Sequence, residues 1–143
     1  MLVSLMAIGL FAAIAQTASD STQSLQYNML MQVRGREITG LCMMEKAADG
    51  SIVGTVVSEM GMKTFDFIYN NGKAKLLNVF KPIDKWYIKR VLNNDFTLLL
   101  ANLNTKQEIK KKRRVITPQP TGEIVMRNTR YNICYTLIPT LLE

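Results

Sequence analysis

The sequence contains no histidine among its 143 residues. This absence excludes Ser-His-Asp and Cys-His nucleophile activation, His-ligated metal sites and acid–base catalysis by imidazole. Cysteine is scarce as well, since Cys42 and Cys134 are far apart and neither belongs to the C-x-x-C pattern of redox or zinc sites. The two thiols either pair or remain buried and free, and the sequence does not decide between these states. The sequence therefore indicates no catalytic residue, no metal and no cofactor.

The N-terminus carries no charged side chain over its first 18 residues and is apolar from Leu2 to Ala15. This run is shorter than the roughly 20 residues of a membrane-spanning helix. We interpret residues 1–18 as a secretory signal peptide cleaved after Ala15 or Ala18, with a buried first helix as the alternative. Residues 19–26 are then a disordered linker and residues 27–143 a single domain. Export would place this domain in the periplasm or at the outer-membrane periphery of a Gram-negative bacterium.

Short apolar stretches interrupted by turn residues about every ten positions follow from Tyr27 onward, a spacing typical of an antiparallel meander. Asn71-Gly72 is the strongest hairpin signal, because this pair fits a two-residue type I′ turn. Phe65 and Phe67 alternate with Asp66, which predicts an aromatic side facing the core. The expected strands are 27–34, 37–46, 51–59, 62–70, 73–80, 123–128 and 130–138.

A helical period replaces the strand period after Pro82, where Ile88, Val91, Leu92 and Leu99 recur at helical offsets. This segment predicts one amphipathic helix, or two helices divided at Asn93-Asn94. The predicted fold class is α+β, with a strongly curved antiparallel sheet of about seven strands and the helical segment laid against one face.

The positive charge of the chain belongs to its second half. Residues 20–80 contain six basic and six acidic side chains, whereas residues 81–143 contain twelve and five. One interpretation of the basic run 106–114 is an exposed loop or edge strand whose lysines prevent sheet-to-sheet pairing. The other is docking on an anionic membrane surface, where each cation contributes about 1 kcal/mol. The candidate docking residues are Lys106, Lys110, Lys111, Lys112, Arg113 and Arg114. Nucleic acid is not an expected partner, because no aromatic residue is interleaved with this run.

Four segments of the sequence resemble those of a known family. They are Ile38-Thr39-Gly40-Leu41, the stretch from Ser58 to Phe67, the stretch from Lys81 to Lys85, and the stretch from Asp95 to Leu100. Over residues 27–138 the chain resembles exported lipoprotein-like proteins of Bacteroidetes-type bacteria, which look like members of the LolA/LolB-like superfamily of lipoprotein-localisation factors. The resemblance implies a half-open antiparallel barrel with one or two helices on its concave face, whose apolar interior accepts acyl chains. The chain departs from that pattern in lacking a lipid-attachment cysteine.

The leading hypothesis is a non-enzymatic cell-envelope protein that binds a lipid or a lipoprotein acyl chain in the concave interior and docks on membranes with the basic run. Methionine suits a pocket for variable apolar ligands, although ordinary core packing is the alternative for each one. The candidate ligand-binding residues are Met29, Met31, Met43, Phe65, Phe67 and Trp86. The alternative function is an accessory subunit of an envelope complex, with a filled core and a protein partner. An enzyme is not predicted, because no spacing brings two carboxylates to a shared site.

Overall fold

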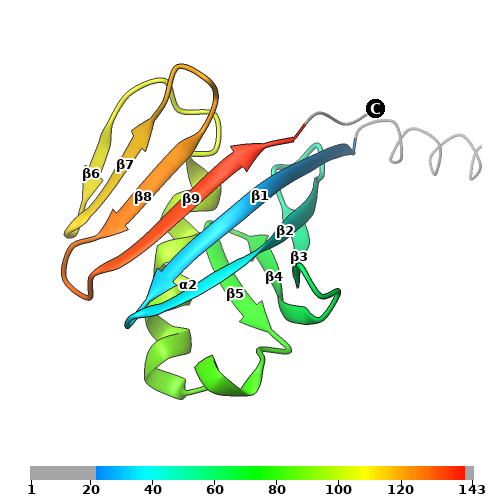
Figure 1. Cartoon of the computed structure of the whole chain (residues 1–143). Coiled ribbons are helices and arrows are strands. Elements are labelled where there is room, and N and C mark those ends of the chain that lie inside the picture. The colour runs from blue at the N-terminus through cyan, green and yellow to red at the C-terminus, as the bar shows by residue number, and fades with distance from the viewer. Residues whose placement is uncertain (1–21, 141–143) are drawn as a thin grey trace, which may run out of the picture.

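Residues 22–140 are described by a computed structural model (Figure 1). They form one antiparallel sheet of nine strands and a 16-residue α-helix, α2 (Trp86–Ala101), preceded by a short 3-10 helix, η1 (Lys81–Ile83). The strands are β1 (Gln23–Val33), β2 (Arg36–Lys46), β3 (Ile52–Ser58), β4 (Lys63–Asn70), β5 (Lys73–Leu77), β6 (Ile109–Lys111), β7 (Arg114–Pro118), β8 (Ile124–Asn128) and β9 (Ile133–Pro139). The α+β class and the antiparallel sheet are thus confirmed.

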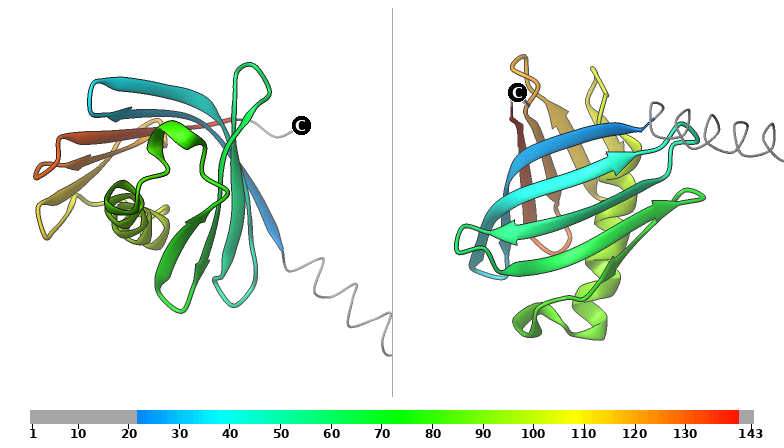
Figure 2. Two further views of the ribbon diagram at one scale, coloured as in Figure 1. Left: turned by 90° about the horizontal axis from the view of Figure 1, so that it is seen from below. Right: turned by 90° about the vertical axis from the view of Figure 1, so that its right-hand side faces the viewer.

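The sheet has the order β5-β4-β3-β2-β1-β9-β8-β7-β6, so two meanders are joined where β1 pairs with β9. β5 and β6 are the two edges, and the sheet is not closed. The strands curve around α2, which lies on the concave side (Figure 2). This arrangement lets a single helix cover core-facing side chains from both meanders.

The concave face is filled by side chains of the sheet and of α2. Phe96 of α2 contacts Phe65 and Phe67 of β4, with ring centroids 5.5 Å apart in each pair, and its ring lies 5.7 Å from that of Tyr135 on β9. All four aromatic rings are buried, as are Leu92 and Leu99 of the helix. The apolar area that these residues remove from water is the main source of stability for the fold.

The edge strand β5 is covered by two polar side chains of α2. The Ala74 N–H donates to Thr97 Oγ1 at 2.9 Å, and the Leu76 N–H donates to Asn93 Oδ1 at 2.8 Å. These contacts satisfy backbone donors that an edge strand otherwise offers to another chain. The polar Asn93 therefore does not divide the helix, because its side chain caps the edge of the sheet.

Two glycines, Gly40 and Gly54, lie where the sheet requires close packing. A Cβ at Gly54 would lie 2.3 Å from Cζ of Phe67, whose ring therefore occupies the space above this glycine. A Cβ at Gly40 would lie 2.4 Å from the carbonyl oxygen of Val57. Both positions exclude larger residues for steric reasons.

Several predictions need correction. The sheet has nine strands, two more than the seven that the sequence predicts, because residues 109–111 form β6 and residues 114–118 form β7. For the basic run, the sequence is compatible with either an exposed loop or an edge strand. β1 begins at Gln23, so the predicted linker is wrong for residues 23–26, while the predicted signal peptide lies outside the described residues. The sequence leaves open whether the two cysteines pair. Cys42 and Cys134 are free, with Cys42 buried and Cys134 half-buried.

Candidate functional site

The antiparallel topology collects several turns at one end of the sheet, which we call the Trp86 end. It comprises the β1–β2 turn (34–35), the β3–β4 loop (59–62), the start of α2, the β6–β7 turn (112–113) and the β8–β9 turn (129–132). A cation–π contact ties the helix start to the first turn, with the Arg34 guanidinium carbon 5.8 Å from the centroid of the Tyr87 ring. Residues distant in the sequence thus share one surface.

Large apolar side chains are exposed at the Trp86 end. Met60 is 88% exposed, Met62 68% and Trp86 73%, and Tyr87 and Tyr131 at the same end are exposed as well. Trp and Tyr combine an apolar ring with a polar group, a combination that favours interfaces between water and an apolar phase. These exposed residues distinguish this end as a candidate interaction surface.

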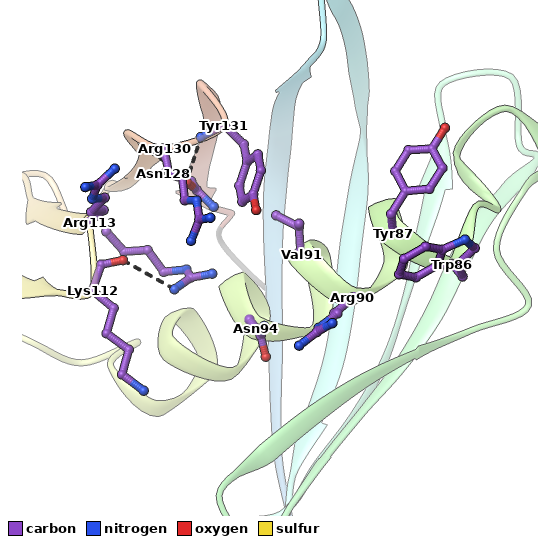
Figure 3. Close-up of a pocket in the computed structure, with 11 residues that line it drawn as sticks. Trp86, Tyr87, Arg90, Val91, Asn94, Lys112, Arg113, Asn128, Arg130 and Tyr131 are labelled. Carbon is purple, nitrogen blue, oxygen red and sulfur yellow. Dashed lines mark hydrogen bonds between the residues drawn. The ribbon is translucent and has the colours of Figure 1, made fainter.

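A cleft of about 650 Å³ lies between α2 and the two turns of the second meander (Figure 3). Trp86 and Tyr87 lie toward one end of the cleft and Lys112 and Arg113 toward the other (Figure 3). Its lining residues are Trp86, Tyr87, Arg90, Val91, Asn94, Lys112, Arg113, Arg114, Asn128, Arg130 and Tyr131. A volume of this size is ordinary for a small-molecule site.

The lining of the cleft is strongly cationic and contains no carboxylate. Arg90, Lys112, Arg113 and Arg130 are exposed, and none of them pairs with a carboxylate within residues 22–140. A concave surface lined by one sign of charge concentrates the field and attracts ions of the opposite sign. The cleft can therefore accept an anionic group.

At the floor of the cleft, the buried carboxylate of Asp95 on α2 accepts hydrogen bonds from two lining residues, Arg114 and Asn128. Asp95 Oδ1 accepts a 2.5 Å bond from Arg114 Nε and a 2.9 Å bond from Asn128 Nδ2, and Oδ2 accepts a 2.5 Å bond from the Tyr135 hydroxyl. Burial raises the pKa of Tyr135 well above its usual value, and the nearby Asp95 charge raises it further. Asp95 thus links the helix to β7, β8 and β9 and does not face the cleft.

The six residues predicted to bind a ligand do not form one site. Met29, Met31, Phe65 and Phe67 are buried in the packed core. The prediction for Met43 is wrong, because Cys42 and Met44 face the core and Met43 lies on the opposite face of β2. Trp86 does not cover the interior either, since its exposed side chain lines the cationic cleft.

The basic run is divided among three environments. Lys106 lies at the opposite end of the sheet, beside Pro118 to Glu123. Lys110 and Lys111 lie on the edge strand β6, in agreement with the interpretation that lysines protect an edge, and Lys110 Nζ lies 3.7 Å from Glu108 Oε1. Lys112 and Arg113 form the turn at the cleft.

Arg114 requires a correction, because its guanidinium is committed to the fold. Its side chain is 15% exposed and pairs with Asp95, whose side chain is fully buried. A buried charge that lost this partner would carry a large desolvation penalty. Arg114 is therefore unavailable for membrane docking.

Sequence reasoning missed seven lining residues of the cleft, among them the charged or aromatic Arg90, Tyr87, Arg130 and Tyr131. The adjacent pair Arg130-Tyr131, a cation beside an aromatic residue in a turn, was a signal that could have drawn attention to this region. Its proximity to Arg90 and Trp86 depends on the sheet order, which no local pattern reveals.

Two further features bear on the class of the protein. Within residues 22–140, His, Cys, Asp and Glu side chains form no group of three or more that could hold a metal ion. None of the helices that these residues form combines the length and the apolarity that crossing a bilayer requires. Compared with known proteins, the chain matches no protein-family model and no curated protein.

Proposed function

We propose that the protein is a non-enzymatic cell-envelope protein that docks on anionic membrane surfaces through its Trp86 end. The observation that carries the proposal is that exposed apolar side chains share this end of the sheet with cations that pair with no carboxylate among residues 22–140. Each cation near an anionic bilayer contributes about 1 kcal/mol, and Trp and Tyr favour the headgroup level. Export to the periplasm or the outer-membrane periphery belongs to the same proposal and is supported by the apolar residues 2–15.

The filled core opposes the expected binding of a lipid or lipoprotein acyl chain in the concave interior. Met31, Phe65 and Phe67 are at most 1% exposed, and the rings of Phe65 and Phe67 pack against Phe96 of α2. An acyl chain would enter the concave face only if α2 moved away and these contacts were broken. Within the proposal, the acyl chains of the lipid stay in the bilayer while the protein contacts the headgroups.

Sedimentation with vesicles tests the docking function. The chain should bind vesicles that contain phosphatidylglycerol, should ignore vesicles of pure phosphatidylcholine, and should be released by salt, because exposed charges are screened. Trp86→Ser should weaken binding. Val53→Ser is the matched control, because Val53 is also an exposed apolar residue but lies near the opposite end of its strand. Equal loss in both variants, or no binding by the parent chain, would refute the docking function.

The second candidate is an accessory subunit of an envelope complex. The observation that favours it is the core filled by the side chains of the protein itself. This candidate predicts that the purified chain ignores vesicles of every composition, and that a photo-cross-linker placed at Tyr131 yields one defined adduct with an envelope protein. Vesicle binding without such an adduct would contradict it.

A further inference from the structure

We propose that the cationic cleft is a binding site for one phosphorylated lipid headgroup, with the phosphate between Arg90, Arg113 and Arg130 and the apolar part of the lipid along Trp86. The proposal rests on the docking function and adds a specific site to it. Docking alone requires only a charged surface, whereas a site predicts a preference for one headgroup chemistry.

The charge of the cleft favours an anion with more than one negative charge. Four exposed cations, Arg90, Lys112, Arg113 and Arg130, are among its lining residues, and no carboxylate is. The carboxylate of Asp95, whose partners Arg114 and Asn128 line the cleft, is buried and already accepts bonds from Arg114, Asn128 and Tyr135. It therefore neutralises Arg114, whereas Arg90, Arg113 and Arg130 pair with no carboxylate within residues 22–140. The guanidinium carbon of Arg130 lies 5.3 Å from the centroid of the Tyr131 ring. Arginine matches the geometry of a phosphate because its planar group can donate two parallel hydrogen bonds.

The backbone holds two of these arginines in neighbouring turns. The N–H and the hydroxyl of Thr129 each donate to the carbonyl oxygen of Arg113 at 2.9 Å, which links the β8–β9 turn to the β6–β7 turn. Asn128 Oδ1 accepts 3.1 Å bonds from the N–H groups of Arg130 and Tyr131. Because Asn128 also donates to Asp95, the turns are anchored to the floor of the cleft. The site is thus supported before any ligand arrives, which reduces the entropic cost of binding.

The other end of the cleft is aromatic. Trp86 and Tyr87 contact each other edge to face at 5.7 Å between ring centroids, and the Arg34 guanidinium carbon lies 5.8 Å from the centroid of the Tyr87 ring. Figure 3 shows these rings at the end of the cleft opposite to Lys112 and Arg113. A ligand that spans the cleft therefore needs an anionic part and an apolar part.

The position of the cleft favours a lipid over a soluble phosphorylated molecule. The cleft lies at the Trp86 end, which also carries the exposed Met60 and Met62. When this end rests on a bilayer, a headgroup can reach the arginines while its glycerol and upper acyl carbons remain close to Trp86.

The test compares two anionic lipids at the same surface charge. Vesicles with phosphatidic acid, a phosphomonoester, and vesicles with phosphatidylglycerol, a phosphodiester, are matched for zeta potential. The parent chain should bind the phosphatidic acid vesicles about tenfold more tightly, as one additional charged hydrogen bond implies. Arg113→Gln and Arg130→Gln should each remove this preference. Lys106→Gln, which removes the same charge at the opposite end of the sheet, should retain it.

The outcomes separate the site from the docking function. Equal binding to both vesicles by the parent chain, or loss of the preference in Lys106→Gln, would overturn the site and leave docking intact. No binding to either vesicle would refute both the site and the docking function.

Two soluble competitors distinguish a lipid from a free phosphate: glycerol 3-phosphate and dispersed short-chain phosphatidic acid. Because half of the cleft is apolar, glycerol 3-phosphate should compete about tenfold more weakly. Equal potency of the two competitors would overturn the assignment to a lipid. Thermal unfolding of each variant confirms that it is folded, which is expected because Arg113 and Arg130 are exposed.

Discussion

Asp95 is the residue on which the attachment of α2 to the second meander depends. Its two carboxylate oxygens accept bonds from Arg114, Asn128 and Tyr135, which lie on β7, β8 and β9. A fully satisfied buried network of this kind specifies one packing arrangement, whereas the removal of one charged member leaves the other uncompensated.

Asp95→Asn should therefore lower the free energy of unfolding by about 3 kcal/mol, since the Arg114 guanidinium would remain in a largely buried position without its counter-charge. Urea unfolding measures the change. Tyr135→Phe is the control for the hydroxyl alone and should cost about 1.5 kcal/mol. The combination of Asp95→Asn with Arg114→Met should recover part of the loss, because it removes the uncompensated charge. An Asp95→Asn variant as stable as the parent would contradict this role.

The stability of the protein should decline at alkaline pH. Burial raises the pKa of the Cys42 thiol from 9.0 to about 12, and the pKa of Tyr135 lies well above 10.0 for the same reason. Above pH 9 the unfolded chain loses the Cys42 proton while the folded chain keeps it, so the unfolded state binds fewer protons. The free energy of unfolding should then fall by about 1.4 kcal/mol per pH unit for each such group.

Cys42→Ala isolates the thiol from the tyrosines. Urea unfolding between pH 9 and pH 10 should show the decline in the parent chain and a flatter dependence in the variant, whatever the variant loses in packing. Above pH 10 both proteins should lose stability, because Tyr135 is present in each. The same slope in both proteins below pH 10 would contradict the assignment to Cys42.

At the scale of elements, the β6–β7 turn combines an unfavourable backbone with the cations of the cleft. Lys112 and Arg113 have φ values of 50° and 63°, in the left-handed region that favours glycine and asparagine. A side chain other than glycine or asparagine in this region costs roughly 1 kcal/mol. The turn therefore places two cations at the cleft in spite of this backbone cost.

Replacement of Lys112-Arg113 by Asn-Gly should thus raise the free energy of unfolding by about 1 kcal/mol, because this pair fits the turn without strain. The same change should weaken binding to anionic vesicles, since it removes two cations of the cleft. The control is Lys73→Gln with Lys75→Gln, which removes the same charge from β5. Vesicle binding that falls equally in both variants would show that net charge alone matters.

The local sequence predicted most of the first meander and α2. Asn71-Gly72 and the alternation around Phe65 and Phe67 encode their structure within a few residues, so the turn and the buried face of β4 could be inferred directly. The β6–β7 hairpin could not, because Lys112-Arg113 carries none of the usual turn residues. Its strands are also short, and their polar side chains conceal the alternation.

The cleft depends on contacts that no local pattern contains. Asp95 and Tyr135 are 40 positions apart. In the sequence, Asp95 cannot be distinguished from the other polar residues of an amphipathic helix, because its partners lie on β7, β8 and β9. The pairing of β1 with β9 brings the β1–β2 and β8–β9 turns to one end. Sequence reasoning therefore identified the basic run and Trp86 separately but did not join them in one cleft.

At the scale of the whole molecule, the three most exposed large apolar side chains, Met60, Met62 and Trp86, lie at the same end as the cationic cleft, which predicts a single orientation on a membrane. Met60, Met62 and Trp86 would approach the bilayer, while the β2–β3 turn and Lys106 at the opposite end would remain in water. Electrostatic attraction would bring this end to the surface and apolar contact would hold it there.

The emission of Trp86 tests this orientation most directly, because it is the single tryptophan of the chain and is 73% exposed. Addition of phosphatidylglycerol vesicles should shift its emission to shorter wavelength as the ring leaves water, and salt should reverse the shift. The double variant Lys112→Gln with Arg113→Gln keeps the apolar residues 1–21 and should show a smaller shift. This variant therefore separates binding through the Trp86 end from binding through the N-terminus. An emission spectrum that does not change while the protein sediments with the vesicles would contradict docking through the Trp86 end.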